Sequence, residues 1–230
     1  IAEAKKQGAD IVILPECFDI GWANQNALAI AKASYGKVIK KLSKSAQENG
    51  IYVIAGVTEY TDGKLYNSAL TFNKKGKIID RHHKINILIG IEDMYEVGSS
   101  LNVFETPFGK FGVSICADNL KGSLSIPETL ARMGAEIILS PSSWAVSPDG
   151  NEWREPYTAI SKKYSIPVVG VSNVGRITTG PWKDWIGIGN SIYTDTKGNA
   201  YNLPFGENAE CLKVIELEIV SPVKKGTELT

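Results

Sequence analysis

Short apolar runs alternate with amphipathic segments along most of the chain. Runs rich in β-branched residues predict strands, and helical spacing of apolar residues predicts helices, two of which end at Gly8 and Gly50. Residues 85–106 carry the weakest pattern and predict a long loop segment. The predicted strands are 10–14, 51–60, 65–72, 77–84, 111–116, 136–142, 166–173, 189–194 and 213–219, and the predicted helices are 1–7, 32–49, 127–134 and 155–164.

The order of these elements predicts an α/β protein. Helices alternate with buried strands, while Asp62-Gly63 and residues 74–76 carry hairpin signals. We therefore expect a mixed sheet system with helices covering it on the outside. The length of 230 residues, 43% of them hydrophobic, suits one domain over residues 1–230.

Charge and cysteine content narrow the classes of function. Basic and acidic side chains both number 25, so no excess charge predicts binding to nucleic acid or to an anionic membrane. The apolar runs fall far short of the roughly 20 residues that span a bilayer. The 3 cysteines form no CxxC pair, which favours a reducing compartment and a cytoplasmic protein. Because the chain starts at Ile1 without methionine, we expect a segment to be missing from its front.

Three strand ends carry side chains that could do chemistry. In open α/β folds, ligands gather at the carboxyl ends of strands, and here those ends carry Glu16, Lys84 and Cys116. Taken alone, each has an ordinary explanation: a packed thiol, a solvated turn carboxylate and an edge charge. The functional interpretation depends on the three together.

A nucleophilic Cys116 would need a group that removes its proton, since the thiolate is the attacking species. Histidine is the usual partner, but His82 and His83 are adjacent in one predicted strand, so at most one could face the thiol. A buried carboxylate with a raised pKa can act as the base, and a lysine can stabilise an oxyanion. Glu16 and Lys84 supply these groups without histidine.

At these residues the chain resembles the nitrilase superfamily of carbon-nitrogen hydrolases, whose site is a Glu-Lys-Cys triad. The matching pieces are LPE at 14–16, RHHKINIL around Lys84 and SICAD at 114–118. Glu92, eight residues after Lys84 and 24 before Cys116, stands where amidases of the family carry a second glutamate. The resemblance covers nearly the whole chain and implies a four-layer α-β-β-α sandwich that commonly forms homodimers or higher homo-oligomers. The family's first strand is absent here.

The resemblance also implies a mechanism that needs no metal or organic cofactor. Glu16 would be the general base, Cys116 the nucleophile, and Lys84 with the Ala117 backbone N–H the oxyanion stabilisers; Glu92 would position substrate or base. The substrate would be a small-molecule amide, nitrile or carbamoyl compound. Further candidates for substrate contact are Asn119, Ser143 and Trp144.

Departures from the family pattern bear on substrate choice. Asn86 stands where histidine is frequent, Ala117 replaces an aromatic residue, and the segment 119–125 is lengthened by LKGSLS. Ala117-Asp118 departs from the Cys-Trp-Glu of nitrilases, and Leu120 and Lys121 replace the arginine typical of carbamoyl-amino-acid hydrolases. We therefore expect an amidase acting on a small or medium linear amide, with specificity set by residues 119–125.

Other functions stay open at this point. Cys17, His82 or His83, and Cys116 could form a metal site, although no local ligand pair is present. A nucleotide-binding module is disfavoured because neither GxxxxGK[ST] nor GxGxxG occurs. A catalytically silent family member acting as a scaffold is the remaining alternative.

Overall fold

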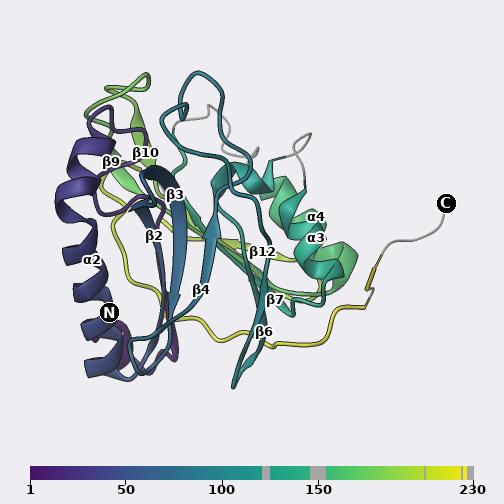
Figure 1. Ribbon diagram of the computed structural model, residues 1–230. Coiled ribbons are helices and arrows are strands. Elements are labelled where there is room, and N and C mark those ends of the chain that lie inside the picture. The colour runs from purple at the N-terminus through teal and green to yellow at the C-terminus, as the bar shows by residue number, and fades with distance from the viewer. Residues whose placement is uncertain (121–124, 146–153, 205, 224, 227–230) are drawn as a thin grey trace.

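Two β-sheets lie face to face in the computed structural model, with helices on each outer surface (Figure 1). The structure describes residues 1–120, 125–145, 154–204, 206–223 and 225–226. This order of layers is the α-β-β-α sandwich that the family resemblance implied, and that expectation is confirmed.

The first sheet has the order β1-β2-β3-β4 and is covered by the long helix α2. β1 runs parallel to β2, and the other neighbours are antiparallel. The β2–β3 hairpin turns at Asp62-Gly63, where both residues have positive φ, as the sequence predicted. The elements are α1 (Ala2–Lys6), β1 (Ile11–Leu14), α2 (Ala27–Asn49), β2 (Tyr52–Thr61), β3 (Lys64–Phe72) and β4 (Ile78–His83).

The second sheet has the order β12-β11-β8-β7-β6-β5, and its central strands β6, β7 and β8 are parallel. Helices α3 and α4 cover its outer face (Figure 1). A separate hairpin, β9–β10, follows β8. The elements are β5 (Val103–Thr106), β6 (Gly109–Val113), α3 (Ile126–Arg132), β7 (Ile137–Ser142), α4 (Arg154–Tyr164), β8 (Val168–Ser172), β9 (Val174–Arg176), β10 (Ile186–Ile188), β11 (Ile192–Thr194) and β12 (Ala200–Asn202).

The two sheets are in contact where β2 faces β7. A Cβ placed on Gly56 would lie 2.5 Å from the carbonyl oxygen of Pro15 and 2.9 Å from Cβ of Pro141, so only glycine fits there. Ile54 and Ala69 of the first sheet share one apolar core with residues of the second. This close contact brings the carboxyl end of β1 against the second sheet.

Some sequence predictions were wrong. Residues 213–219 do not form a strand; Ile215, Leu217 and Ile219 pack their side chains on the core from an extended segment, so their alternation reflects packing without strand pairing. β5 lies within the stretch 85–106 predicted to be loop, and the strand predicted at 189–194 is shortened to β11. None of the helices in the described part of the chain has the length and apolarity that a bilayer-spanning segment needs.

Candidate active site

Glu16 lies two residues beyond β1 and is fully buried. Its backbone is held from the second sheet, because Glu16 N donates to Ser142 O at 3.2 Å and Asn173 Nδ2 donates to Glu16 O at 2.7 Å. Its Oε1 accepts from Lys84 Nζ at 2.8 Å and from Asn67 Nδ2 at 2.7 Å. Its Oε2 is buried and has no hydrogen-bond partner among the described residues. One oxygen is therefore anchored by two donors, and the other has none among the described residues.

Lys84 follows β4 directly and places its ammonium between two buried carboxylates. Its Nζ lies 2.8 Å from Glu16 Oε1 and 2.8 Å from both oxygens of Glu92. A buried ammonium requires such partners, since an unpaired charge in the interior is strongly destabilising. The sequence-predicted Glu16, Lys84 and Glu92 are thus brought together in one row.

Glu92 is fully buried, and its carboxylate is surrounded by donors besides Lys84. Trp22 Nε1 and Asn67 Nδ2 donate to Oε1 at 2.7 and 3.1 Å, and Leu88 N donates to Oε2 at 3.0 Å. Sequence analysis did not identify Asn67 or Trp22. Asn67 could have been found as the polar residue at an inward-facing position of β3, whereas Trp22 lies in a segment without periodicity.

Cys116 begins a short 3-10 turn, Cys116–Asn119, and is 3% exposed. β6 ends at Val113, so the strand predicted through Cys116 is too long by three residues. Cys116 has φ +41°, a left-handed conformation that non-glycine residues rarely adopt. Such outliers persist where the surroundings hold them, and they occur often at active sites.

Asp118 ties this turn to the segment that carries Lys84. His82 Nε2 lies 2.8 Å from Asp118 Oδ2, and Ile115 N donates to the same oxygen at 2.9 Å. Asn86 N and Ile85 N donate to Oδ1 at 2.9 and 3.2 Å. The inward-facing histidine is therefore bound to a structural carboxylate.

Burial and neighbouring charges set the protonation states of the site. Burial raises the pKa of Glu16 to about 6; Lys84 acts to lower it, and the charge of Glu92 raises it further. Burial and the charge of Glu16 raise the pKa of the Cys116 thiol well above its usual value, against the opposing effects of Lys84 and the Ser143 backbone. Burial acts to lower the pKa of Lys84, but the two carboxylates hold it well above its usual value. The site thus holds a neutral thiol, an ammonium and a carboxyl group whose pKa is raised to about 6.

The remaining sequence candidates lie in the Cys116 turn or directly after β7. Asn119 uses its amide within the protein, donating to Cys116 O at 3.1 Å and Ser140 Oγ at 2.9 Å, which suits support of the turn. Ser143 contributes a backbone hydrogen bond to the thiol. Trp144 is buried and meets Tyr157 edge-on at 5.6 Å between ring centroids. Ala117 is buried in the Cys116 turn. Of the expected specificity segment, residues 121–124 lie outside the described residues.

The alternative metal site has no support in the described part of the chain, where no group of three potential ligands occurs. Cys17 Sγ lies 3.7 Å from the Tyr95 hydroxyl, and His83 Nε2 lies 3.0 Å from Glu59 Oε2. With His82 bound to Asp118, the proposed ligands face different partners.

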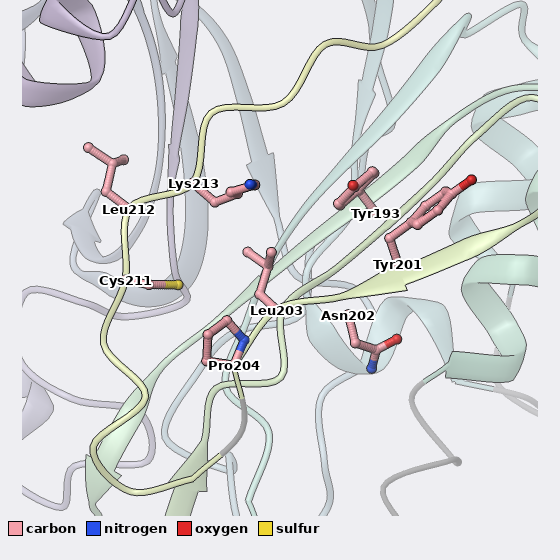
Figure 2. A pocket seen from close by; sticks show the side chains of 8 residues that line it. All are labelled: Tyr193, Tyr201, Asn202, Leu203, Pro204, Cys211, Leu212 and Lys213. Carbon is pink, nitrogen blue, oxygen red and sulfur yellow. The ribbon is translucent and has the colours of Figure 1, made fainter.

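A surface hollow of about 510 Å³ lies apart from these residues (Figure 2). β11, β12 and the extended segment after them supply its walls. Cys211, an exposed free thiol, lies on that segment. The lining residues are Tyr193, Tyr201, Asn202, Leu203, Pro204, Cys211, Leu212 and Lys213. Since none of them belongs to the row of Glu16, Lys84 and Glu92, the hollow is distinct from the candidate active site.

Comparison with known proteins identifies relatives of the chain. The family described as "Carbon-nitrogen hydrolase" matches residues 1–220. Omega-amidase NIT2 of Xenopus tropicalis is 32% identical over 163 residues, which cover 66% of this chain and 58% of that protein. Omega-amidase NIT2 of Danio rerio is 26% identical over 240 residues, covering 100% of this chain and 84% of the relative. The chain thus matches little more than half the length of the Xenopus relative.

Solved structures agree on the fold. An amidase from Nesterenkonia sp. AN1 superposes with a TM-score of 0.78 at 16% identity, over 89% of this chain and 80% of that one. A carbon-nitrogen hydrolase from Helicobacter pylori G27 gives a TM-score of 0.77 at 21% identity, over 90% and 76%. Because the family matches residues 1–220, the chain belongs to the carbon-nitrogen hydrolases of the nitrilase superfamily.

Proposed function

We propose that the protein is an amidase-type thiol hydrolase that cleaves a non-peptide carbon–nitrogen bond through a thioester on Cys116. One observation carries the proposal: the buried Glu16 carboxylate is anchored through Oε1 by Lys84, while Oε2 has no partner in the described structure. Burial raises the pKa of the Cys116 thiol, and the nearby charge of Glu16 raises it further. The difference between the two oxygens of Glu16 suits a general base, because the proton is received at one defined oxygen.

Acylation follows from these positions. Glu16 Oε2 takes the proton of the Cys116 thiol as the sulfur attacks the carbonyl carbon of the amide. The carbonyl oxygen becomes an oxyanion, which Lys84 and the Ala117 backbone N–H stabilise. Glu16 then returns the proton to the departing nitrogen, the carbon–nitrogen bond breaks, and ammonia or an amine leaves a thioester on Cys116.

Deacylation uses the same base. Water loses a proton to Glu16 as its oxygen attacks the thioester carbon, and Lys84 again faces the oxyanion. The carbon–sulfur bond breaks, the carboxylic acid is released, and the proton held by Glu16 returns to Cys116. All atoms come from the amide, water and this chain.

The substrate we propose is a small or medium linear amide. The relatives named omega-amidase support an amide over a nitrile or carbamoyl compound. The Ala117-Asp118 sequence after the nucleophile also differs from the nitrilase pattern. Hydrolysis of a nitrile or an N-carbamoyl compound with the same residues is the alternative.

Trapping of the acyl-enzyme tests the proposal. The protein is mixed with a panel of linear amides, nitriles and N-carbamoyl compounds, quenched in acid and examined by mass spectrometry for an acyl adduct. We expect the adduct on Cys116 and its loss in Cys116→Ala, whereas Cys211→Ala, which removes the exposed thiol of the surface hollow, retains it. Hydrolysis that persists in Cys116→Ala would exclude Cys116 as the nucleophile. The absence of adduct and turnover across the panel would favour a silent scaffold.

We also propose that the protein works in the cytoplasm as a homodimer or higher homo-oligomer. Free Cys17, Cys116 and Cys211 suit a reducing compartment, and assembly is the common habit of the family. Cell fractionation and light scattering of the purified protein test these two statements. Recovery outside the cytoplasm, or a monomer at micromolar concentration, would contradict them.

A further inference from the structure

We infer that Trp22 is a positioning residue, which acts on the reaction by fixing the Glu92 carboxylate through its indole N–H. The inference rests on the proposed function and extends it to a residue outside the triad. Trp22 Nε1 donates to Glu92 Oε1 at 2.7 Å, the shortest hydrogen bond that the described residues make to that carboxylate. Trp22 is 4% exposed and Glu92 is fully buried, so water does not readily replace this bond.

The bond matters because Glu92 forms one end of the buried row. Lys84 Nζ is held between Glu92 and Glu16, at 2.8 Å from each. Asn67 Nδ2 spans the same two carboxylates. A displaced Glu92 would therefore move the ammonium that anchors the base and faces the oxyanion. Positions in such sites must hold to within about 0.5 Å for full activity.

The ring of Trp182, tilted by 58° to that of Trp22, helps to fix the indole that makes this bond. The rings of Trp22 and Trp182 have centroids 4.8 Å apart, and Trp182 stacks at 4.8 Å on Trp185, which is 46% exposed. The chain between β9 and β10 also presses against the Trp22 segment: a Cβ on Gly180 would lie 2.3 Å from the carbonyl oxygen of Ala23. These contacts restrict the orientation of the Trp22 ring, so that its single N–H donor stays directed at Glu92.

The substitution Trp22→Phe removes the N–H donor and keeps an aromatic ring. Bonds to charged groups are the stronger class, so we expect kcat to fall about 10- to 100-fold with a smaller change in KM. The matched control is Trp185→Phe, which removes the same atoms from a half-exposed ring that stacks on the Trp182 ring. The control should keep the wild-type kcat. Equal effects of the two substitutions would overturn the inference.

A double-mutant cycle separates positioning from structural support. Glu92→Met removes the acceptor at similar volume, so Trp22→Phe in that background should lower the rate by less than about twofold. A cost of Trp22→Phe that is unchanged in the Glu92→Met background would show that the indole acts elsewhere. Thermal unfolding is measured in parallel, and a fall in midpoint with kcat intact would assign Trp22 a structural role only.

A second readout keeps this inference distinct from the proposed function. Iodoacetamide alkylates Cys116 by displacement of iodide, with the thiol proton passing to Glu16, and mass spectrometry separates this adduct from that on Cys211. If no amide is hydrolysed, the proposed function fails. The inference on Trp22 is still supported if Trp22→Phe slows the alkylation of Cys116 and Trp185→Phe does not. Equal alkylation rates in the two variants would refute it.

Discussion

Replacing Asp118 by asparagine tests how the turn Cys116–Asn119 is held against the Lys84 segment. Asp118 is fully buried, and its two oxygens accept from three backbone N–H groups, those of Ile115, Ile85 and Asn86, and meet His82 Nε2. Asparagine keeps the shape but replaces one acceptor oxygen by a donor. With the amide oxygen toward Ile85 and Asn86, the Ile115 N–H faces an NH₂ group.

The expected loss of stability follows from these contacts. One buried backbone donor loses its acceptor, which costs about 1–3 kcal/mol, and the remaining bonds lose a charged partner. We therefore expect the free energy of unfolding to fall by about 3 kcal/mol at pH 7. Asp10→Asn is the control, since Asp10 is exposed and its contact with Lys74, at 3.4 Å, is a surface ion pair. It should change stability by less than about 1 kcal/mol.

The effect of Asp118→Asn on the free energy of unfolding should depend on pH. Burial acts to raise the pKa of Asp118, but the hydrogen bond and charge of His82 and the backbone donors hold it below its usual value. The folded state thus favours the carboxylate, so this stability is present above the unfolded pKa, near 3.9, and is lost as pH falls through the folded value. Urea unfolding should show the Asp118→Asn deficit at pH 7 and a smaller one below pH 4. A deficit under about 0.5 kcal/mol at pH 7, or one that grows in acid, would refute the reasoning.

Two further predictions concern Glu16 and its support. With its pKa raised to about 6, the base is ionised above that pH, so kcat/KM should fall on the acid side with a limb near pH 6. Glu92→Gln removes a charge that raises this pKa, so the limb should move to lower pH; an upward shift measured in a pH–rate profile would be contradictory. Gly56→Ala should lower kcat at least about tenfold, because the added Cβ would lie 2.6 Å from Glu16 Cα. The control is Gly36→Ala in α2, where the added Cβ meets open space. It should raise the free energy of unfolding by about 0.5–1 kcal/mol. Wild-type kcat in Gly56→Ala would contradict this account.

The sequence predicted the elements that end at the site better than it predicted the contacts within it. Alternating and buried runs placed the ends of β1 and β4 close to Glu16 and Lys84, and both side chains lie in one buried row. The way in which the two sheets pack on each other depends on close contacts such as those around Gly56. The local pattern of apolar and polar residues does not encode these contacts.

What the sequence missed has a common physical reason. Asn67, Trp22 and Asp118 act through hydrogen bonds to residues far along the chain, and no sequence spacing reports a partner 51 or 70 residues away. The short β9–β10 hairpin was missed for a related reason, since each of its strands has three residues, too few to show a period. Conversely, the alternation of Ile215, Leu217 and Ile219 predicted a strand where the chain only packs its side chains.

The charges of the buried row explain why a second carboxylate accompanies the base. A single carboxylate beside Lys84 would form a neutral pair, and the ammonium would lower the pKa of that carboxylate and weaken it as a base. With Glu92 present, the Lys84 ammonium pairs with two carboxylates. The charge of Glu92 acts to raise the pKa of Glu16, and Lys84 acts to lower it. Burial also raises the pKa of the Cys116 thiol and keeps it protonated, so in the proposed mechanism the proton moves as the sulfur attacks. The donors on Glu92, from Trp22, Asn67 and Leu88, stabilise its charge and leave Glu16 Oε2 as the buried oxygen that can receive the proton.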